Sequence, residues 1–439
     1  MTRSVRCLFS IFPRAQHTAA SSPAMAQSKE LDHYKLIFND VKTRPYNQDL
    51  GCPKSSVLND HLKDRLSGSL VGLAVGDAVG AYFEFKSAEF VRRNAPIGMR
   101  SGGTWSLDAG QWTDDTSMAL CLAASLLMTG ECDPYDQTMR YLAWYERSYL
   151  SSKEGDGPAF DIGIGTRGTL DKFSMWQSDL VCKLIKNNSE RIEAKYKFEG
   201  SVYDAVRKEF PSAGNFAHAT TGGNGSLMRL APIPVFFHSD TQAAITSAEV
   251  SSITTHRAGF AIDACKFYAA LICEAFRPGA TKAVLLDSGF RDKFPGLRNL
   301  DRQIVEIAEG SYKTPVNAPP HDIVGNSNGA ASKALKAALW AIYNDEDSFK
   351  RGVELAVGLG GDTDTVAAIY GQLAGRYTDI QIQESPKNGV TNCTSTILYE
   401  ILRCILVNDM LSNDNDYFCT DFTSRFFYDN DNLHDFGVT

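Results

Sequence analysis

The sequence lacks the cysteine patterns of zinc sites and of disulfide-stabilised domains. It contains ten cysteines but no CxxC motif, and its closest pair, Cys265 and Cys273, is separated by eight positions. Scattered cysteines of this kind are typical of a protein in a reducing compartment, where they act as small apolar side chains. We therefore expect neither zinc ligation nor a disulfide framework to hold this fold together.

The sequence also lacks a basic surface signature and an uninterrupted apolar span. Lysine and arginine total 44 against 52 acidic residues, a net charge of −8, and the basic residues form no stripe between aromatics. Binding of nucleic acid through phosphate contacts is therefore disfavoured. The apolar stretch that comes nearest to crossing a bilayer, at 66–85, contains Asp77 and Glu84, so we expect no membrane span.

No Pro/Ser-rich linker and no internal repeat divides the chain, which favours one large domain over 60–411. Residues 1–28 contain three arginines, no acid and many serines and alanines. They are either a mitochondrial transit peptide or a disordered extension ahead of an internal start at Met25. Residues 412–439 form an acidic C-terminal tail. We expect a monomer in the cytoplasm or the mitochondrion.

Helical periodicity dominates the chain from 60 to 410, and alternating apolar and polar runs are scarce. Asp133 followed by Pro134 is typical of a helix start, and Gly130 of a helix end. The sequence predicts an all-α, many-helix protein whose polar motifs lie where helices begin. The predicted helices cover residues 66–84, 116–130, 255–279, 331–343 and 348–360.

The first predicted helix carries a stripe of glycines at four-residue spacing. Each glycine costs a helix roughly 1 kcal/mol relative to alanine, so another helix must approach this face closely. Asp77 and Glu84 lie among the apolar residues of the same segment, where an unpaired carboxylate is costly to bury. These two acids therefore require a cation or a hydrogen-bond donor. The glycines are Gly68, Gly72, Gly76 and Gly80.

Two clusters of Asp and Thr precede predicted helices far apart in the chain, in "GQWTDDTSMA" and "LGGDTDTVAA". Each alone could be a helix cap, which contributes about 1 kcal/mol. Adjacent carboxylates repel each other unless a positive charge lies between them, so the matched pair favours two halves of one cation site. The clusters are Thr113, Asp114, Asp115 and Thr116, and Asp362, Thr363, Asp364 and Thr365.

The side-chain types indicate which cation such a site would hold. Carboxylate and hydroxyl oxygens without nearby His or Cys suit hard ions such as Mg²⁺, Mn²⁺ or Ca²⁺. An EF-hand is excluded because "DTDTVAAIYGQL" lacks Gly at its sixth position and the closing Glu. The number of carboxylates fits a pair of metals with room for substrate oxygens.

Glycine-rich loops between helices are weaker signals. "TTGGNGSLMRLAPIP" could turn backbone N–H groups toward an anion, although an ordinary turn explains it equally well. Asp161, in "FDIGIGTRGTL", could bind a sugar hydroxyl or cap a helix. His256 follows Thr255 at the start of a predicted helix and is either a capping residue or part of a site.

Six motifs together resemble the ADP-ribosylglycohydrolase family in order and rough spacing, over about residues 64–380. They are "GLAVGDAVGAYFE", "GQWTDDTSMA", "DIGIGTRGTL", "GGNGSLMRLAP", "TTHRAG" and "GLGGDTDTVAAIYGQLAG". The resemblance implies a single all-α orthogonal bundle with two Mg²⁺ or Mn²⁺ ions. It implies cleavage of the bond between C1″ of ADP-ribose and a protein side chain, with Arg and Ser linkages both open.

The resemblance also assigns roles to residues. The implied metal ligands are Thr113, Asp114, Asp115, Asp362, Asp364 and Thr365. Glu84 matches an acid at the mouth of the site, and Asp161 an active-site acid of arginine-directed relatives. The loop at 222–228 would hold the phosphates and distal ribose, with His256 beside the nucleotide. The residues expected to bind substrate are Gly223, Asn224, Gly225, Ser226, Met228 and His256.

Two further questions stay open at this point. Attack of water at C1″ needs a proton acceptor, for which Asp115 and Glu84 are both suitable, and another acid must protonate the leaving group. Two rival functions are a non-catalytic, crystallin-like family member and a hydrolase of a small ADP-ribosyl compound. The intact Asp/Thr clusters argue against a purely structural protein.

Overall fold

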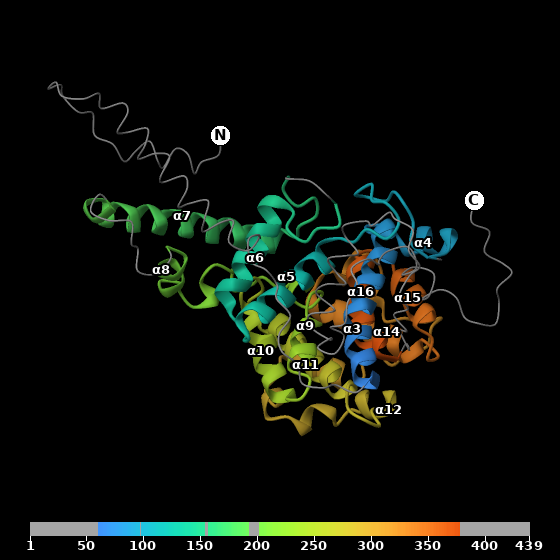
Figure 1. Cartoon of the computed structure of the whole chain (residues 1–439). Coiled ribbons are helices and arrows are strands. Elements are labelled where there is room, and N and C mark those ends of the chain that lie inside the picture. Colours follow the sequence, from blue (N-terminus) through green and yellow to red (C-terminus); the bar gives the residue numbers. More distant parts are fainter. Residues whose placement is uncertain (1–59, 97, 154–156, 193–201, 378–439) are drawn as a thin grey trace, which may run out of the picture.

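The computed structural model describes residues 60–96, 98–153, 157–192 and 202–377 (Figure 1). The predicted N-terminal segment at 1–28 and the acidic tail at 412–439 lie outside the described residues. Within those residues the chain forms helices and three isolated bridges, with no named strand. The prediction of an all-α protein is therefore confirmed.

The described residues contain fourteen α-helices joined by short 3₁₀ turns and loops. The α-helices are α3 (Asp60–Gly80), α4 (Ala88–Asn94), α5 (Asp114–Thr129), α6 (Pro134–Arg147), α7 (Ile164–Ile192), α8 (Val202–Lys208), α9 (Pro232–Phe236), α10 (Thr241–Ile253), α11 (Gly259–Ala275), α12 (Lys282–Leu285), α13 (Arg302–Ala308), α14 (Ala331–Asn344), α15 (Phe349–Gly358) and α16 (Thr363–Ala374). The 3₁₀ turns are η1 (Ala81–Phe83), η2 (Ala213–Asn215), η3 (Asn224–Ser226), η4 (Phe290–Lys293), η5 (Pro295–Leu297), η6 (His321–Ile323), η7 (Gly325–Gly329) and η8 (Gly375–Tyr377).

Several predicted helix ends agree with the structure. Helix α5 ends at Thr129, where Gly130 takes φ +71° and donates its N–H to the carbonyl of Leu126. Helix α6 begins behind Asp133, whose carboxylate accepts the N–H groups of Tyr135 and Asp136. Both boundaries follow from local chemistry, because a left-handed glycine and an Asp before Pro each satisfy free backbone groups of one helix end.

The predicted helix at 255–279 starts too early. Residues 255–258 belong to the turn between α10 and α11, and α11 begins at Gly259. The backbone N–H groups of Arg257 and Ala258 both donate to the carbonyl of Thr221, at 3.1 and 3.0 Å. A contact distant in sequence thus holds this turn out of the helix.

Helices α3 and α16 lie side by side at the centre of the molecule although they come from opposite ends of the described chain (Figure 1). A Cβ added to Gly68 would lie 2.3 Å from the carbonyl oxygen of Gly375, and one added to Gly72 would lie 2.3 Å from that of Gly371. At Gly76 an added Cβ would lie 2.1 Å from the carbonyl oxygen of Ala367. The glycine stripe therefore serves backbone-to-backbone packing, as the sequence predicted.

Helix α3 is also the one described helix that is long and apolar enough to cross a membrane. The segment His61–Phe83 has a mean hydropathy of 1.3, but 94% of its most apolar window is buried inside the fold. Its neighbour α16 is buried along its whole length. The apolarity of α3 is accounted for by its place in the core.

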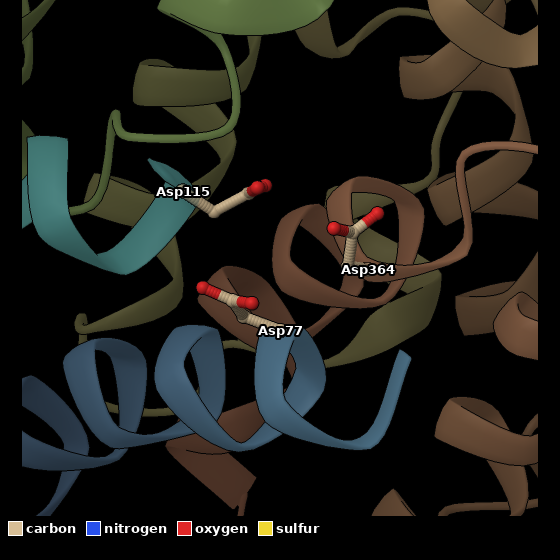
Figure 2. A group of neighbouring side chains, drawn as sticks. All are labelled: Asp77, Asp115 and Asp364. Atoms are coloured by element: carbon tan, nitrogen blue, oxygen red, sulfur yellow. The ribbon is translucent and has the colours of Figure 1, made fainter. Parts of the chain in front are cut away.

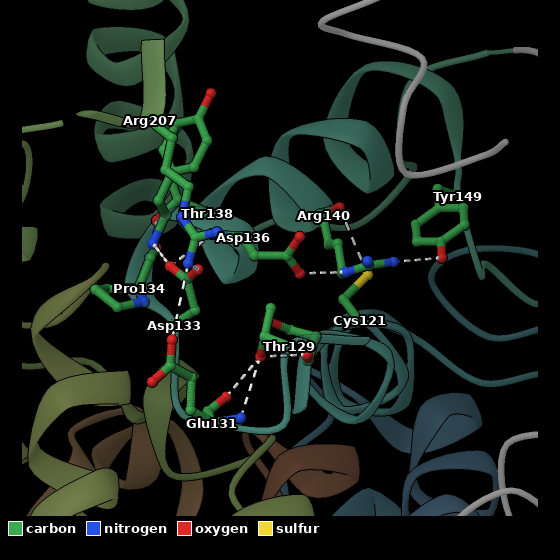
Figure 3. Close-up of polar contacts among 12 residues, drawn as sticks. Cys121, Thr129, Glu131, Asp133, Pro134, Asp136, Thr138, Arg140, Tyr149 and Arg207 are labelled. Carbon is green, nitrogen blue, oxygen red and sulfur yellow. Dashed lines mark hydrogen bonds and ion pairs between the residues drawn. The ribbon is translucent and has the colours of Figure 1, made fainter. Parts of the chain in front are cut away.

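A buried ion pair lies within α6, next to a contact with α5 (Figure 3). Arg140 donates from Nε to Asp136 at 2.6 Å, with both side chains almost fully buried. The carbonyl of Arg140 lies 3.6 Å from Sγ of Cys121 on α5. At the start of the same helix, Arg207 forms an ion pair with Asp133. Of these contacts, the one from Cys121 joins α6 to α5, whose first turn enters the candidate site.

Candidate metal centre and active site

The packing of α3 on α16 brings acids from both helices to one place. The two helices are antiparallel: Gly68 near the start of α3 contacts Gly375 just after α16, and Gly80 at the end of α3 contacts the backbone of Asp364 near the start of α16. The last turn of α3 therefore lies against the first turn of α16. Asp77, near the end of α3, is placed beside the second Asp/Thr cluster.

Asp77 links this pair of helices to α5. Its carboxylate accepts the backbone N–H and the hydroxyl of Thr113, at 3.0 and 2.9 Å, and those of Thr116, at 3.0 and 2.7 Å. Thr113 and Asp362 precede α5 and α16, and neither side chain caps its own helix. The helix-capping interpretation of the two clusters is therefore wrong, because α5 is capped by a carboxylate from α3.

Two groups of three carboxylates have oxygens within 4.8 Å of one another among the described residues. The first comprises Asp77, Asp115 and Asp364, which approach one another from α3, α5 and α16 in Figure 2. The second comprises Glu84, Asp362 and Asp364. Asp364 belongs to both groups, so the two Asp/Thr clusters form one continuous acidic site.

The hydrogen bonds inside this site are too few for its acceptors. Oγ1 of Thr113 lies 2.9, 3.0 and 3.3 Å from oxygens of Asp77, Asp115 and Asp364, but it carries one hydrogen. Oδ1 of Asp115 is buried and has no hydrogen-bond partner. A buried carboxylate oxygen without a donor is strongly destabilising unless a cation satisfies it. The donor set of carboxylates and hydroxyls fits a hard divalent cation.

The other predicted metal ligands lie around this centre. Oγ1 of Thr365 is 3.4 Å from Oδ2 of Asp115, which joins the two clusters directly. Asp114 is buried at the start of α5, but its oxygens belong to neither group of three. Thr363 faces away, as expected, because its hydroxyl donates to the carbonyl of Gly80 at 2.8 Å.

Burial and mutual repulsion raise the pKa values of these acids. Burial, followed by the charge of Asp362, raises the pKa of Glu84 to about 8. Burial, followed by the charges of Asp77 and Asp362, raises the pKa of Asp114 to about 7. The pKa values of Asp115 and Asp364 are also raised well above the usual range, first by burial. Without a cation, the site therefore retains protons at neutral pH.

Glu84 is held by a residue that the sequence did not single out. Trp105 donates its indole N–H to Oε2 of Glu84, and the hydroxyl of Thr104 donates to the Glu84 carbonyl at 3.1 Å. The side chain of Glu84 is only 4% exposed. One carboxylate oxygen is thus oriented by Trp105, and the other is free to act in the site. The only signal in the sequence was the acid itself, at the end of an apolar helix.

Asp161 lies in the loop that leads into α7 and is 8% exposed. Its pKa is raised well above the usual range, first by burial and then by the charges of Asp114 and Glu84. Asp161 therefore shares the electrostatic environment of the acidic site, as its sequence motif suggested.

The glycine loop before α9 reaches the same site. Asn224 donates from Nδ2 to Oδ2 of Asp362 at 2.7 Å, and Gly223 forms a bridge with Ala330 at the start of α14. Gly360 and Gly361 precede Asp362 with φ of +70° and +79°, a conformation that favours glycine. These two residues turn the chain so that Asp362 enters the site.

Asn328 supports this turn, a role that was not predicted from the sequence. Its Nδ2 donates to the carbonyl of Gly360 at 2.9 Å, and its Oδ1 accepts the N–H of Asp362 at 3.1 Å. One buried amide side chain therefore fixes the residues on both sides of Gly361. Its motif, "VGNSNGAA", resembles an ordinary polar loop, so only the folded chain shows its role.

The remaining predicted binding residues divide into two groups. His256 is buried beneath the loop, and a Cβ added to Gly225 would lie 3.1 Å from its Nε2. Ser226 and Met228 face the interior instead. The hydroxyl of Ser226 accepts that of Ser252 at 2.9 Å, and the Met228 side chain is 3% exposed in the hydrophobic core. The loop therefore offers mainly its backbone at Gly223 and Gly225, with the Asn224 side chain.

Comparison with known proteins identifies the class of this fold and site. The family model of ADP-ribosylglycohydrolase matches residues 58–408. A solved structure titled "ADP-ribosylglycohydrolase-related protein complex" is 32% identical, with a TM-score of 0.55, and the match covers 79% of this chain and 98% of that one. The chain belongs to the ADP-ribosylglycohydrolase family, and it is a glycohydrolase acting on ADP-ribose linkages. The predicted fold type is confirmed.

Three of the individual relatives carry two names between them. ADP-ribosylarginine hydrolase Tri1 of Pseudomonas putida is 33% identical over 312 residues, covering 71% of this chain and 70% of the relative. The protein of the same name from Serratia proteamaculans is 30% identical over 328 residues, covering 74% and 75%. ADP-ribosylhydrolase ARH3 of Gallus gallus is 26% identical over 357 residues, covering 71% and 85%.

Proposed function

We propose that this protein is a metal-dependent hydrolase that releases ADP-ribose from modified arginine side chains by cleaving the glycosidic bond at C1″. The observation that carries this proposal is the buried oxygen Oδ1 of Asp115, which lacks a donor inside a cluster of carboxylates from three helices. A group of acids that meets across α3, α5 and α16 is costly to maintain without a cation.

The residues proposed to hold two Mg²⁺ or Mn²⁺ ions are those predicted from the sequence: Thr113, Asp114, Asp115, Asp362, Asp364 and Thr365. Asp77 has a different role, because its oxygens already accept four hydrogen bonds from Thr113 and Thr116. It orients Thr113 and fixes the first turn of α5. When bound, the cations would supply Lewis-acid polarisation of oxygen groups and neutralise the clustered charge.

Glu84 is our candidate for the residue that accepts the proton of the attacking water. Trp105 fixes one oxygen of Glu84 and leaves the other available near Asp362 and Asp364, whereas Asp115 is itself one of the residues proposed to hold a cation. A positioned general base contributes typically 10²- to 10⁴-fold to a rate. We expect Glu84→Gln to lower kcat by about that factor while Mg²⁺ affinity changes little. A kcat within about twofold of the unmodified enzyme would assign the role to Asp115 instead.

Electrostatics favour an arginine linkage over a serine linkage. The guanidinium of an arginine side chain is cationic, and Glu84 and Asp161 are buried acids beside the cluster. A cationic guanidinium beside these acids favours their ionised forms and is stabilised by them, whereas a neutral serine hydroxyl gains less. The two relatives named for arginine-linked substrates, at 33% and 30% identity, support the same choice.

The glycine loop supplies the binding part of the proposal. Backbone N–H groups at Gly223 and Gly225 and the amide of Asn224 suit the phosphates and distal ribose of ADP-ribose. Asn224 also contacts Asp362, so ligand binding and the metal-binding acids are connected through one side chain. His256 beneath the loop offers an additional polar contact to the nucleotide.

The test uses two peptides of the same sequence, one ADP-ribosylated on Arg and one on Ser, incubated with the full chain and Mg²⁺. We expect release of free ADP-ribose from the Arg peptide, at a rate at least tenfold above that from the Ser peptide. Faster release from Ser would overturn the proposed linkage. Mg²⁺ binding without release from either peptide, or from small ADP-ribosyl compounds, would favour the non-catalytic, crystallin-like alternative.

A further inference from the structure

Arg229 is a fully buried arginine that forms no ion pair with a carboxylate in the part of the chain that the structure describes. Its Nη2 lies 3.3 Å from the carbonyl of Ser251, 3.2 Å from Oγ1 of Thr254 and 2.8 Å from Oγ1 of Thr255. The guanidinium carbon is 4.3 Å from the ring centroid of Tyr141. The buried guanidinium of Arg229 therefore donates its hydrogen bonds to the end of α10 and to the turn between α10 and α11.

The shortest of these contacts, between Nη2 of Arg229 and Oγ1 of Thr255, determines the direction in which the Thr255 hydroxyl points its hydrogen. A guanidinium can only donate, so Oγ1 of Thr255 must accept from Arg229. The second partner of this oxygen is Nδ1 of His256, at 2.9 Å. Among the described residues no other acceptor is found for the hydroxyl hydrogen of Thr255, which is fully buried. The hydroxyl therefore donates to Nδ1, and the hydrogen of the neutral imidazole is on Nε2.

Nε2 of His256 faces the glycine loop. A Cβ added to Gly225 would lie 3.1 Å from Nε2 of His256, and one added to Gly223 would lie 3.5 Å from it. A Cβ added to Gly165, on α7, would lie 4.0 Å from the same nitrogen. Three glycines therefore lie close to this nitrogen on the side of the loop. Within the described chain Nε2 makes no hydrogen bond, and it is not among the fully enclosed polar atoms.

We propose that Arg229 and Thr255 are positioning residues that hold His256 as a neutral imidazole with its hydrogen on Nε2, directed at a phosphoryl oxygen of a nucleoside diphosphate seated over Gly223 and Gly225. This inference rests on the proposed function for the identity of the ligand. The tautomer itself follows from the contacts of Thr255 alone.

Chemistry favours this arrangement over the two alternatives. An imidazole with its hydrogen on Nδ1 would present a lone pair to the phosphoryl oxygen and repel it. A protonated imidazole is disfavoured because burial, followed by the charge of Arg229, lowers the pKa of His256 to about 3. The neutral Nε2–H form can bind an anion without taking up a proton.

The direct test is nuclear magnetic resonance of the full chain labelled with ¹⁵N-histidine, free of metal and substrate. The chain has eight histidines, and the His256→Gln variant assigns the signal. We expect the Nε2–H tautomer alone in the unmodified protein, a mixture of tautomers in Thr255→Val and restoration in Thr255→Ser. Thr254→Val is the matched control, because Thr254 contacts Arg229 but not His256, and it should leave the tautomer unchanged.

Two spectroscopic results would overturn the inference: an Nδ1–H tautomer in the unmodified protein, or an unchanged tautomer in a folded Thr255→Val variant. Binding of ADP-ribose provides a second readout that needs no turnover. We expect Thr255→Val to weaken binding about tenfold, the effect of one lost hydrogen bond, and Thr255→Ser to restore it. Equal affinity in all three proteins would overturn the ligand contact.

The proposed function can fail independently of this inference. If ADP-ribose binds and the tautomer behaves as expected, but no ADP-ribosyl peptide is hydrolysed, the catalytic proposal is contradicted and the positioning role of Thr255 is supported. If peptides are hydrolysed and the Thr255→Val variant has an unchanged KM, the positioning role is contradicted and the catalytic proposal stands.

Discussion

Asp115 shows most directly why this site needs a cation. One of its oxygens has no donor, and the other lies 3.0 Å from Oγ1 of Thr113 and 3.4 Å from Oγ1 of Thr365. Asp77 accepts from Thr113 and Thr116 and Asp364 from the backbone of Thr365, but no described residue donates to Oδ1 of Asp115. A divalent cation supplies the missing positive charge without adding bulk.

At this scale we expect Asp362→Ala to abolish turnover without unfolding the protein. Asn224 donates to this side chain at 2.7 Å, and removing a carboxylate from an acidic cluster relieves repulsion, which offsets the lost hydrogen bond. The measurement is release of ADP-ribose, with circular dichroism as the check on folding. Asp292→Ala, on an exposed carboxylate far from the cluster in sequence, is the control and should keep full activity. Near-normal release by Asp362→Ala would contradict the metal assignment.

Single residues were predictable from the sequence where their motif was local. Asp362 and Asp364 were recognisable because two carboxylates and two hydroxyls stood together before one helix. Trp105 and Asn328 were not, because each contributes through hydrogen bonds to residues at least 20 positions away. Asp77 gave a partial signal, since a carboxylate inside an apolar helix needs a donor, but its two partners at the start of α5, Thr113 and Thr116, could not be inferred.

Among the helices, the pair α3 and α16 determines the geometry of the site. Their glycines allow backbone contact, and this contact sets the distance between Asp77 and Asp364. The sequence predicted a close approach to α3 but could not identify α16 as its partner, because glycine spacing carries no information about the opposite surface. In the same way, the start of α11 depends on the distant carbonyl of Thr221.

We expect Gly76→Ala to destabilise the protein by at least about 2 kcal/mol, because overpacking a tight contact forces the backbone to shift. The added Cβ would lie 2.1 Å from the carbonyl oxygen of Ala367. Gly168→Ala on α7 is the matched control, since nothing lies within 4 Å of its Cβ position. That control should be neutral or stabilising by up to about 1 kcal/mol. Urea unfolding measures both, and equal stability of the two variants would contradict the packing account.

For the whole molecule, the acidic site links stability to pH and to metal. The pKa values of Glu84 and Asp114 are raised in the folded protein, to about 8 and about 7, above their ordinary values of 4.5 and 3.8. The folded state therefore binds more protons than the unfolded state between roughly pH 4 and 8. This stabilising contribution is complete below pH 4 and is lost as pH rises through 7 and 8.

His256 contributes with the opposite sign. Its pKa is lowered to about 3 from 6.5, so the unfolded state binds the additional proton and stability falls as pH decreases below 6.5. The contribution of His256 fades as pH rises above 6.5, and the raised pKa values of the acids then set the direction of the trend. We expect the Tm of the metal-free protein to fall over this range, and saturating Mg²⁺ to raise Tm more at pH 8.5 than at pH 6.5. Equal Mg²⁺ shifts at the two pH values would contradict the linkage.

Metal dependence of hydrolysis tests the central claim most directly. The full chain is treated with a chelator, dialysed and assayed for release of ADP-ribose from an arginine-modified peptide while Mg²⁺ is added back. The account predicts activity below about 1% of the starting value without metal, consistent with loss of metal-dependent polarisation, and recovery with Mg²⁺. Full activity in the chelated protein, with no response to Mg²⁺ or Mn²⁺, would contradict it.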